Sequence, residues 1–323
     1  MGQAHNQRRL AHVEHRRRAV FPLSQPPLKK KQKNIITALS TSKSALLRHD
    51  VAFCLGQRGA SSALPALADR LRDKREHPMV RHEAAEAAGA VGCPGAWQLV
   101  EEHLADATRE VSETCQLAVQ RMAWYEKKQA EEEEEKRTQE AGQQQQHKAA
   151  AEEGGESEKA VVIKRYLSVD PAPPAAPGTP TERLVASLLD ESAETPIFDR
   201  YRALFSLRDA GGAPAVSALC AALRGSTSAL LKHEVAYVLG QMQDPASLGA
   251  LRECLLDAGE HPMVRHEAAE ALGALGAEAA APALEKGASD EDPVVAQSCV
   301  VALDVLAHER SGAFEYAAID GAS

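Results

Sequence analysis

Aromatic residues are scarce in this chain of 323 residues, where they make up 4% of the sequence, whereas alanine is abundant. Runs of residues that favour strands are almost absent as well. Large ring side chains therefore cannot fill the core, and helices that pack closely through small side chains are expected to do so. These deficits favour an all-α fold.

Other absences narrow the class of protein. No apolar run approaches the roughly 18 residues that a membrane-spanning helix needs. The net charge of −9 disfavours nucleic-acid binding and suggests a basic partner. The six cysteines form no CxxC pair and lie within apolar helical patterns. They are expected to be reduced core thiols of an intracellular protein.

One segment occurs twice with little change. Residues 77–92 read HPMVRHEAAEAAGAVG, and residues 261–276 read HPMVRHEAAEALGALG. A related segment precedes each copy, because residues 46–57 read LLRHDVAFCLGQ and residues 230–241 read LLKHEVAYVLGQ. Both pairs of segments have the same offset, so the second half of the chain repeats the first. Within each half the two motif histidines are separated by the same interval.

The interval from His49 to His82 is typical of stacked helical hairpins. The abundance of Ala and Leu, with glycine near the expected helix ends, favours the same architecture. One further step in each direction aligns residues 16–21 with 200–205 and residues 114–115 with 298–299. The sequence resembles the HEAT-like repeat class. We predict an α-α superhelix of HEAT-like helical hairpins, in two four-unit halves related by internal duplication. The His-containing segment is expected to be the second helix of its hairpin.

Composition divides the chain into five segments. Residues 1–43 are irregular and hold a degenerate first repeat, since a proline falls within an expected helix; their lysine run leaves a nuclear signal open. Residues 44–125 and 181–318 are predicted to be the N-terminal and C-terminal HEAT-like halves. Residues 126–180, rich in Glu, Gln and Pro, are predicted to form a disordered linker. Residues 319–323 form a tail.

Four positions in register carry a histidine followed by a carboxylate: His49-Asp50, His82-Glu83, His233-Glu234 and His266-Glu267. Because the surrounding sequence is rich in alanine, these residues are expected to be buried. A buried carboxylate needs a partner for its charge. Stacked helices lie roughly 8–10 Å apart, so the two histidines of each half should face each other. Two histidines and one carboxylate suit non-haem Fe(II). Two such sets closing face to face predict a two-metal centre.

Other interpretations of these residues remain open. A buried histidine that forms a hydrogen bond to a neighbouring helix would explain one of these positions. It explains less readily why four histidine-carboxylate pairs recur at the same repeat position. The zinc-protease motif HExxH is absent, because Glu86 and Glu270 stand where its second histidine would be. We expect His77 and His261 to serve the starts of their helices. Two cysteines at the fourth periodic position, Cys115 and Cys299, are expected to be core residues rather than ligands.

The motifs together resemble those of the deoxyhypusine hydroxylase family. Each half carries one motif of the form L-L-[KR]-H-E, with Asp for Glu in the first half, and one of the form P-M-V-R-H-E-A. Residues 168–174 read SVDPAPP, the strap found between the halves in that family. The resemblance covers about residues 44–125 and 161–318. It implies an iron-dependent monooxygenase that uses O2 to hydroxylate the deoxyhypusine residue of translation initiation factor 5A, completing hypusine.

The resemblance also implies roles for individual residues. The ligands of two Fe(II) ions per chain would be His49, His82, Glu83, His233, His266 and Glu267. No catalytic residue is expected beyond this di-iron centre. Asp50 and Glu234 would bind the amines of the substrate, and Asp50 departs from the family's glutamate by one methylene.

The remaining expectations concern partners and rival functions. The expected protein is a cytoplasmic monomer, with a nuclear location as the alternative, and it binds neither nucleic acid nor membranes. A metal-free HEAT-like adaptor would explain the repeats but not the four registered pairs. A bilin-lyase-like HEAT protein would share the fold without needing iron.

Overall fold

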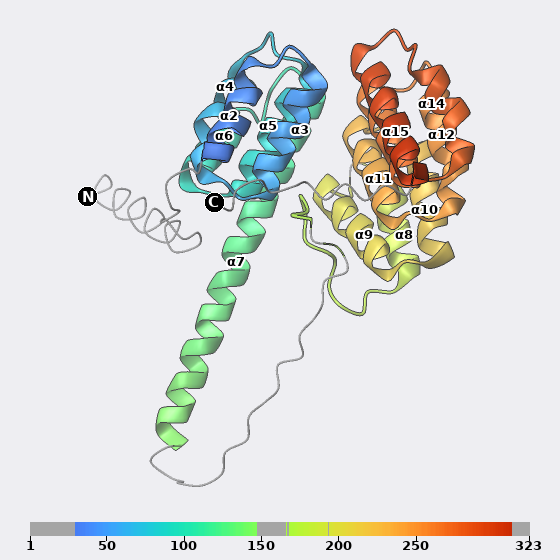
Figure 1. Ribbon diagram of the computed structural model, residues 1–323. Helices are drawn as coiled ribbons and strands as arrows, with labels where there is room; N and C mark the ends of the chain where they lie inside the picture. The colour runs from blue at the N-terminus through green and yellow to red at the C-terminus, as the bar shows by residue number, and fades with distance from the viewer. Residues whose placement is uncertain (1–29, 147–165, 167, 193, 312–323) are drawn as a thin grey trace, which may run out of the picture. The chain divides into compact units, whose positions relative to one another are not determined.

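The computed structural model describes residues 30–146, 166, 168–192 and 194–311 (Figure 1). Within these ranges the regular elements are all helices. The chain divides into an N-terminal unit that ends at Ala172 and a C-terminal unit that begins at Pro173. The irregular residues expected before residue 30, which include most of the degenerate first repeat, and the tail at 319–323 lie outside the described residues.

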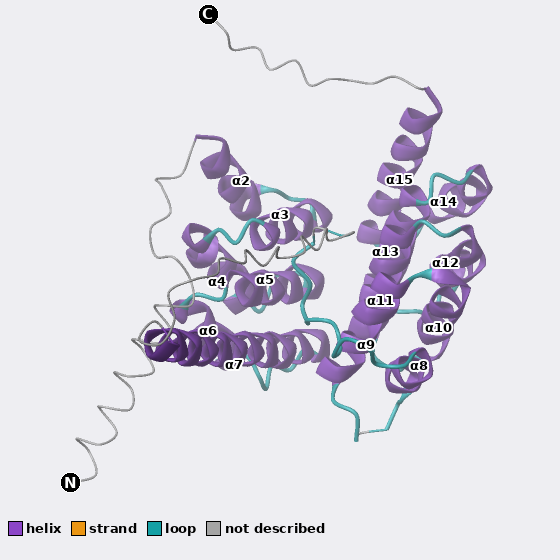
Figure 2. Cartoon of the chain, turned by 90° about the horizontal axis from the view of Figure 1, so that it is seen from below, coloured by secondary structure: helices purple, strands orange, loops and turns teal. Residues whose placement is uncertain are grey.

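From residue 30 onward, the described part of the N-terminal unit forms three helical hairpins. Its helices are α2 (Lys30–Thr41), α3 (Ala45–Gln57), α4 (Leu64–Arg72), α5 (Pro78–Val91), α6 (Pro94–Glu101) and α7 (Arg109–Gln146). Helices α2, α4 and α6 form one layer, and α3, α5 and α7 form the second (Figure 2). The two histidine-carboxylate motifs of this unit lie on α3 and α5, each the second helix of its hairpin, as the sequence predicts.

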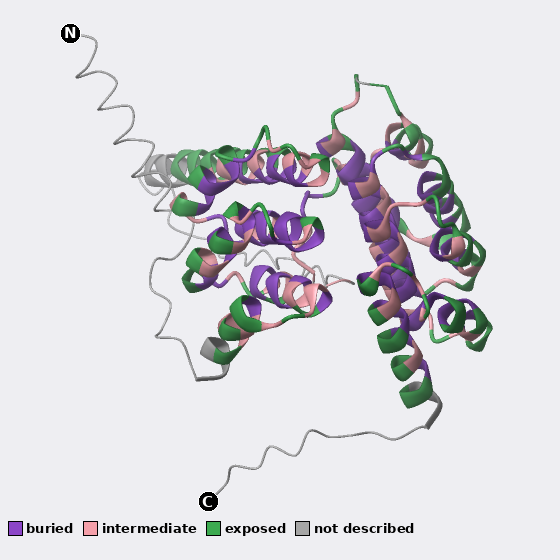
Figure 3. Ribbon diagram, turned by 90° about the horizontal axis from the view of Figure 1, so that it is seen from above, coloured by how far each residue is buried: buried purple, intermediate pink, exposed green. Residues whose placement is uncertain are grey.

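The residues of the C-terminal unit that the structure describes form four hairpins in the same two-layer arrangement. Its helices are α8 (Thr181–Leu189), α9 (Ile197–Ala210), α10 (Gly212–Gly225), α11 (Ala229–Met242), α12 (Leu248–Leu256), α13 (Pro262–Ala274), α14 (Ala281–Gly287) and α15 (Pro293–Ser311). The second helices of the hairpins are α9, α11, α13 and α15, and they stack in that order (Figure 2). In both units burial is concentrated along the second helices (Figure 3). The predicted all-α fold of HEAT-like hairpins is confirmed.

Small side chains set the spacing of the second helices. A Cβ atom added to Gly56 on α3 would lie 2.8 Å from the Cα atom of Ala87 on α5. In the C-terminal unit a Cβ atom on Gly240 of α11 would lie 3.0 Å from the Cα atom of Ala271 on α13. Neither position has room for a methyl group. The close approach brings the histidine of one helix next to the histidine of the next.

Helix α7 extends further than composition indicates. It continues to Gln146, into the segment expected to be a disordered linker. Ion pairs four residues apart support its exposed part, with Lys127 3.7 Å from Glu131 and Lys128 3.9 Å from Glu132. A run of glutamates prevents the formation of a core, but it does not prevent a helix whose surface faces solvent.

The strap, residues 168–175, forms hydrogen bonds within each unit. Val169 pairs with the side chain of Gln57 in the N-terminal unit. In the C-terminal unit the carbonyl oxygen of Pro174 accepts a hydrogen bond of 3.1 Å from Arg202. Of the predicted linker, residues 147–165 lie outside the described part of the chain. No helix within the described ranges is long and apolar enough to cross a membrane.

Candidate metal centre

The N-terminal His–Glu set consists of His49 on α3 with His82 and Glu83 on α5. The two imidazole rings have centroids 5.7 Å apart and planes inclined by 41°. His82 is 0% exposed and Glu83 is 3% exposed. The Oε2 atom of Glu83 lies 3.4 Å from Nε2 of His49. Histidines one repeat apart in sequence are thus brought together, and the carboxylate joins them from the same helix as the second histidine.

The C-terminal His–Glu set consists of His233 on α11 with His266 and Glu267 on α13. Its ring centroids are 5.3 Å apart, with planes inclined by 40°. The Oε2 atom of Glu267 lies 3.3 Å from Nε2 of His233. One donor atom from each of the three residues can be chosen so that all lie within 4.8 Å of one another. The ring separations, ring inclinations and Glu–His distances are thus similar in the two sets. In the N-terminal unit, however, the group whose donor atoms all lie within 4.8 Å of one another is His82, Glu83 and Glu86.

An arginine anchors each helix that carries the second histidine. Arg81 donates from Nε to the carbonyl oxygen of Leu71 at 3.0 Å and from Nη1 to Oδ1 of Asp106 at 3.1 Å. Burial alone would raise the pKa of Asp106, but hydrogen bonds from Arg81 and Lys74 outweigh it and hold the pKa well below its usual range. Arg265 donates to the corresponding carbonyl and carboxylate in the C-terminal unit. The arginine of the HPMVRHE motif thus fixes the position of the helix that carries the second histidine and the glutamate of each set.

The first histidine of the same motif caps the helix. The Nδ1 atom of His77 accepts a hydrogen bond of 3.3 Å from the main-chain nitrogen of Met79, and His261 makes the equivalent bond. Glu76 accepts the main-chain N–H of His77 at 2.7 Å and an Arg48 hydrogen bond of 2.5 Å. This links the residue before His49 to the start of α5. The role at the helix start predicted for His77 and His261 is confirmed.

Asp50 and Glu234, which follow the first histidines, differ in their surroundings. The Oδ1 atom of Asp50 lies 3.1 Å from Nδ1 of His49, and the Asp50 side chain is 49% exposed. Glu234 is only 5% exposed. A carboxylate on the second ring nitrogen of a histidine fixes the tautomer and orientation of the ring. The Asp50 contact therefore directs Nε2 of His49 toward Glu83.

Two further glutamates lie at the sites, and sequence reasoning did not select them. Glu86, one helical turn after His82, forms a group with His82 and Glu83 whose donor atoms all lie within 4.8 Å of one another. The Oε1 atom of Glu270 lies 3.4 Å from Nδ1 of His266. Residues four apart share one face of a helix, so the spacing from each histidine could have indicated them. From the sequence, these two positions were considered only for the second histidine of the HExxH motif, which is absent.

The cysteines at the fourth periodic position are core residues, as expected. Cys115 and Cys299 are both fully buried. Burial raises the pKa of Cys115 to about 12 and the pKa of Cys299 to about 11. A thiol with such a pKa is neutral at neutral pH, whereas metal binding requires the thiolate.

The chemistry of the donors in both His–Glu sets fits a first-row transition metal. Imidazole nitrogen and carboxylate oxygen are the donors that iron prefers in oxygen-activating sites, and three protein ligands leave coordination positions open. A divalent cation would also balance the charge of the buried glutamates. Each unit therefore contains, among its described residues, a group that could hold a metal ion: His82, Glu83 and Glu86 in one unit, and His233, His266 and Glu267 in the other.

Comparison with known proteins identifies the family. The chain is 47% identical over 274 residues to deoxyhypusine hydroxylase from Bos taurus, an alignment that covers 85% of this chain and 80% of the relative. The chain belongs to the deoxyhypusine hydroxylase family. A rice member of the family, deoxyhypusine hydroxylase-B from Oryza sativa subsp. japonica, is 46% identical over 275 residues, which are 84% of this chain and 81% of the relative.

The solved structures and repeat families agree with this assignment. The structure of human deoxyhypusine hydroxylase in complex with glycerol superposes with a TM-score of 0.68 at 40% identity, covering 95% of this chain and 99% of that one. Residues 33–120 and 216–304 match HEAT repeats, and residues 199–225 match the PBS lyase HEAT-like repeat. The latter match spans most of α9 and all of α10, and it describes a repeat rather than a whole enzyme.

Family membership decides between the functions that the sequence left open. The chain is a hydroxylase of this metal-dependent family, and the predicted enzyme class is confirmed. The bovine, human and rice relatives, which each align with about 85% of the chain, are all deoxyhypusine hydroxylases.

Proposed function

We propose that this chain uses two Fe(II) ions and O2 to hydroxylate the deoxyhypusine residue of translation initiation factor 5A. The observation that carries the proposal is the doubled arrangement of two buried histidines and one buried glutamate, once in each unit. Each set would hold one iron. When bound, ferrous ions with open coordination positions supply the electrons and the binding site with which O2 is activated to insert one oxygen atom into a C–H bond.

The protein side chains around the metals orient the ligands. Asp50 accepts the Nδ1–H of His49, which keeps Nε2 of that ring available to a metal. Glu270 stands in the same relation to Nδ1 of His266. We assign Glu86 and Glu270 to this orienting role and retain Glu83 and Glu267 as ligands, because the latter lie beside Nε2 of the histidine on the neighbouring helix.

The substrate requires anchoring as well as oxidation. The deoxyhypusine side chain carries two amines on either side of a four-carbon arm, and both are cationic at neutral pH. Carboxylates hold cationic amines through charge-assisted hydrogen bonds, which fix the carbon that reacts. We assign this role to Asp50 and Glu234. The half-exposed carboxylate of Asp50 can hold the His49 ring with one oxygen and receive an amine with the other.

The compartment and partners follow from the same features. Free thiols at all six cysteines support a reducing compartment, and we propose the cytoplasm. The net charge of −9 favours a substrate protein whose modified region is basic. We propose that the chain acts as a monomer, since each unit holds a complete set of two histidines and a glutamate.

Mass spectrometry of the substrate factor tests the reaction directly. The iron-loaded chain is incubated with the deoxyhypusine form of the factor under isotopically labelled O2. The proposal predicts that the modified residue gains one labelled oxygen atom. Incorporation of oxygen from water, or no change in mass with the iron-loaded chain, would contradict it.

A further inference from the structure

The last second-layer helices of the two units, α7 and α15, differ in exposure at two equivalent positions. The offset between the halves of the sequence pairs Leu117 with Val301 and Arg121 with Val305. Leu117 is 1% exposed and Arg121 is 8% exposed, whereas Val301 is 52% exposed and Val305 is 40% exposed. The two valines lie four residues apart and so share one face of α15. That face is apolar and exposed, although its counterpart on α7 is covered.

The positions that flank Val301 do not differ between the units. Val300 is exposed, as is its counterpart Gln116, and Ala302 is buried, as is its counterpart Ala118. Helix α15 is therefore turned in the same way against its neighbours as α7 is. The difference at Val301 and Val305 comes from what lies over the face and not from a rotation of the helix.

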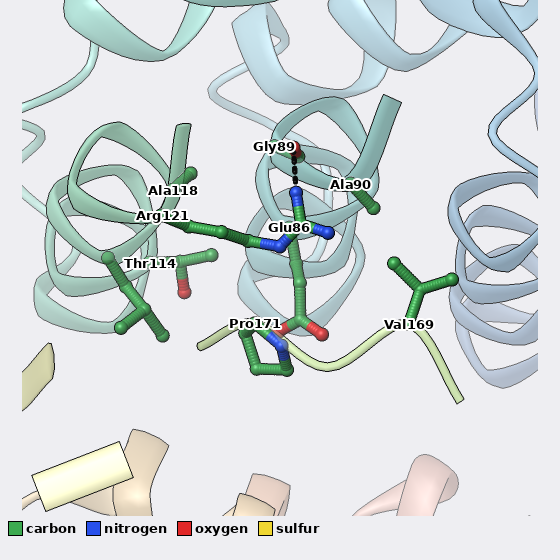
Figure 4. A pocket seen from close by; sticks show the side chains of 9 residues that line it. Glu86, Gly89, Ala90, Thr114, Ala118, Arg121, Val169 and Pro171 are labelled. Carbon is green, nitrogen blue, oxygen red and sulfur yellow. Dashed lines mark hydrogen bonds between the residues drawn. The ribbon is translucent and has the colours of Figure 1, made fainter. Parts of the chain in front are cut away.

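The strap lies over this face in the N-terminal unit. A small pocket is lined by residues of α5 and α7 and by Val169 and Pro171 of the strap (Figure 4). Leu117 and Arg121 both line this pocket, and Arg121 donates to the carbonyl oxygen of Asp170 at 3.0 Å. A short stretch with a β-branched residue, an aspartate and a proline thus buries this face of α7.

The corresponding face of α15 favours an apolar occupant. Val305 replaces Arg121, so the side chain that anchors the strap carbonyl on α7 has no equivalent donor here. A segment over α15 would be held mainly by contact with the two valines. The last helix of a repeat stack normally has a polar outer surface. The valines therefore indicate that a further segment completes this end of the stack.

The sequence directly after α15 contains a stretch that resembles the strap. Residues 319–322 read IDGA, and strap residues 169–172 read VDPA. Both stretches place a β-branched residue before an aspartate, then a residue typical of turns, then alanine. Phe314 and Tyr316 add apolar surface to the same segment. Residues 312–323 lie outside the described residues.

The segment is long enough to return to the valines. The distance along α15 from Ser311 back to Val301 is about 15 Å at the rise of an α-helix. An extended chain from Ser311 to Ile319 spans about 26 Å, which leaves length for a turn. Glycine is favoured just after the end of a helix, where it allows the chain to change direction, and Gly312 occupies that position.

We propose that residues 312–323 fold back along α15 and cover Val301 and Val305 with Ile319, as the strap covers Leu117 on α7 with Val169. The segment closes the exposed end of the C-terminal repeat stack. The strap and this segment are then equivalent covers for the last second-layer helices of the two units. The inference does not depend on the proposed hydroxylation.

Limited proteolysis of the full chain tests the fold-back. Chymotrypsin cleaves after aromatic residues, so cleavage after Phe314 and Tyr316, followed by intact mass, reports how often the segment leaves the helix. A double variant that carries Val301→Asp and Val305→Asp should be cleaved there about tenfold faster than the wild type, because the charges oppose apolar contact.

Val300→Asp is the matched control for this experiment. It introduces the same charge on the same helix, at a position that is exposed in α15 and whose counterpart Gln116 is exposed in α7. We expect it to be cleaved at the rate of the wild type. Equal rates in the wild type and in the folded double variant, with thermal unfolding as the check on folding, would overturn the proposal.

Photo-crosslinking identifies the occupant of the face. A benzophenone residue at position 301 of the full chain should crosslink to residues 312–323 of the same chain, and the same residue at position 300 should not. Crosslinks from position 301 to a second copy, or the absence of any crosslink to residues 312–323, would overturn the assignment.

Discussion

Gly56 on α3 lies against Ala87 on α5 with no space for a methyl group between them, since a Cβ atom at Gly56 would be 2.8 Å from the Ala87 Cα atom. The contact lies two helical turns beyond His49 on α3 and brings that helix close to the helix that carries His82. The spacing of the backbones and the assembly of the N-terminal His–Glu set are therefore coupled. Gly240 and Ala271 make the same contact in the C-terminal unit.

Gly56→Ala should destabilise the N-terminal unit. The added methyl group must push α3 and α5 apart, and overpacking of this kind costs about 1–3 kcal/mol. We expect a lower free energy of unfolding in urea and weaker iron binding. Gly249→Ala is the matched control, because a Cβ atom there meets nothing within 4 Å and alanine favours the helix. Equal stability of the two variants would show that the close contact does not set the spacing.

Asp106→Asn should reduce the sensitivity of stability to acid. The pKa of Asp106 lies below its usual range, so its ionised form stabilises the folded chain. That contribution is present at neutral pH and is lost as the pH falls below about 4, the pKa of aspartate in an unfolded chain. We expect the free energy of unfolding to fall more steeply on acidification in the wild type than in Asp106→Asn. Asp304→Asn, at an exposed position, should follow the wild type; parallel curves for all three chains would contradict the assignment.

Residues 127–138 of α7 are largely exposed. Replacement of residues 127–158 by a shorter Gly/Ser spacer should leave iron content and activity nearly intact, since the described part of this segment is largely exposed. Gln57→Ala, which removes both hydrogen bonds to Val169, should by contrast lower stability by about 1–3 kcal/mol. Loss of iron from a correctly folded spacer variant would reveal a structural role for the segment.

Asp50 is predicted to act on the substrate more than on the metal. Asp50→Ala should retain both irons and bind the deoxyhypusine-bearing factor more weakly, because an amine loses a charge-assisted partner worth about 1.5–3 kcal/mol. Asp50→Glu should be tolerated, as it restores the longer reach of the family's glutamate. Iron analysis and substrate affinity are measured on the same preparations. If Asp50→Ala loses one iron and the remaining protein binds the factor normally, Asp50 acts on the metal, as a ligand or through His49, and not on the substrate.

The sequence was sufficient to predict relationships that follow the repeat. The constant interval between the motif histidines predicts that His49 lies beside His82, because equivalent positions of stacked hairpins are neighbours. The same reasoning placed the motifs on the second helix of each hairpin. It also indicated that a small-residue core would allow close packing, although it did not identify Gly56 and Ala87 as the contact that sets the spacing.

Relationships outside the repeat could not be predicted in this way. Gln57 binds Val169, which is 112 residues away in a segment with no periodic counterpart. Asp50 and Glu234 occupy equivalent positions, yet one is half exposed and the other is buried, because exposure depends on neighbours that the interval does not specify. Composition alone indicated that residues 126–180 cannot form a core. It did not indicate that α7 continues to Gln146, because ion pairs on an exposed helix surface do not require burial.

Iron content per chain is the most direct test of the central claim that each unit holds one metal in its His–Glu set. Elemental analysis of the purified chain should find about two irons, and His82→Ala and Glu267→Ala should each lower this sharply. His308→Ala, at an exposed position near the end of α15, is the control and should keep the wild-type content. Zinc at full occupancy in the wild type, or unchanged iron in both ligand variants, would contradict the account.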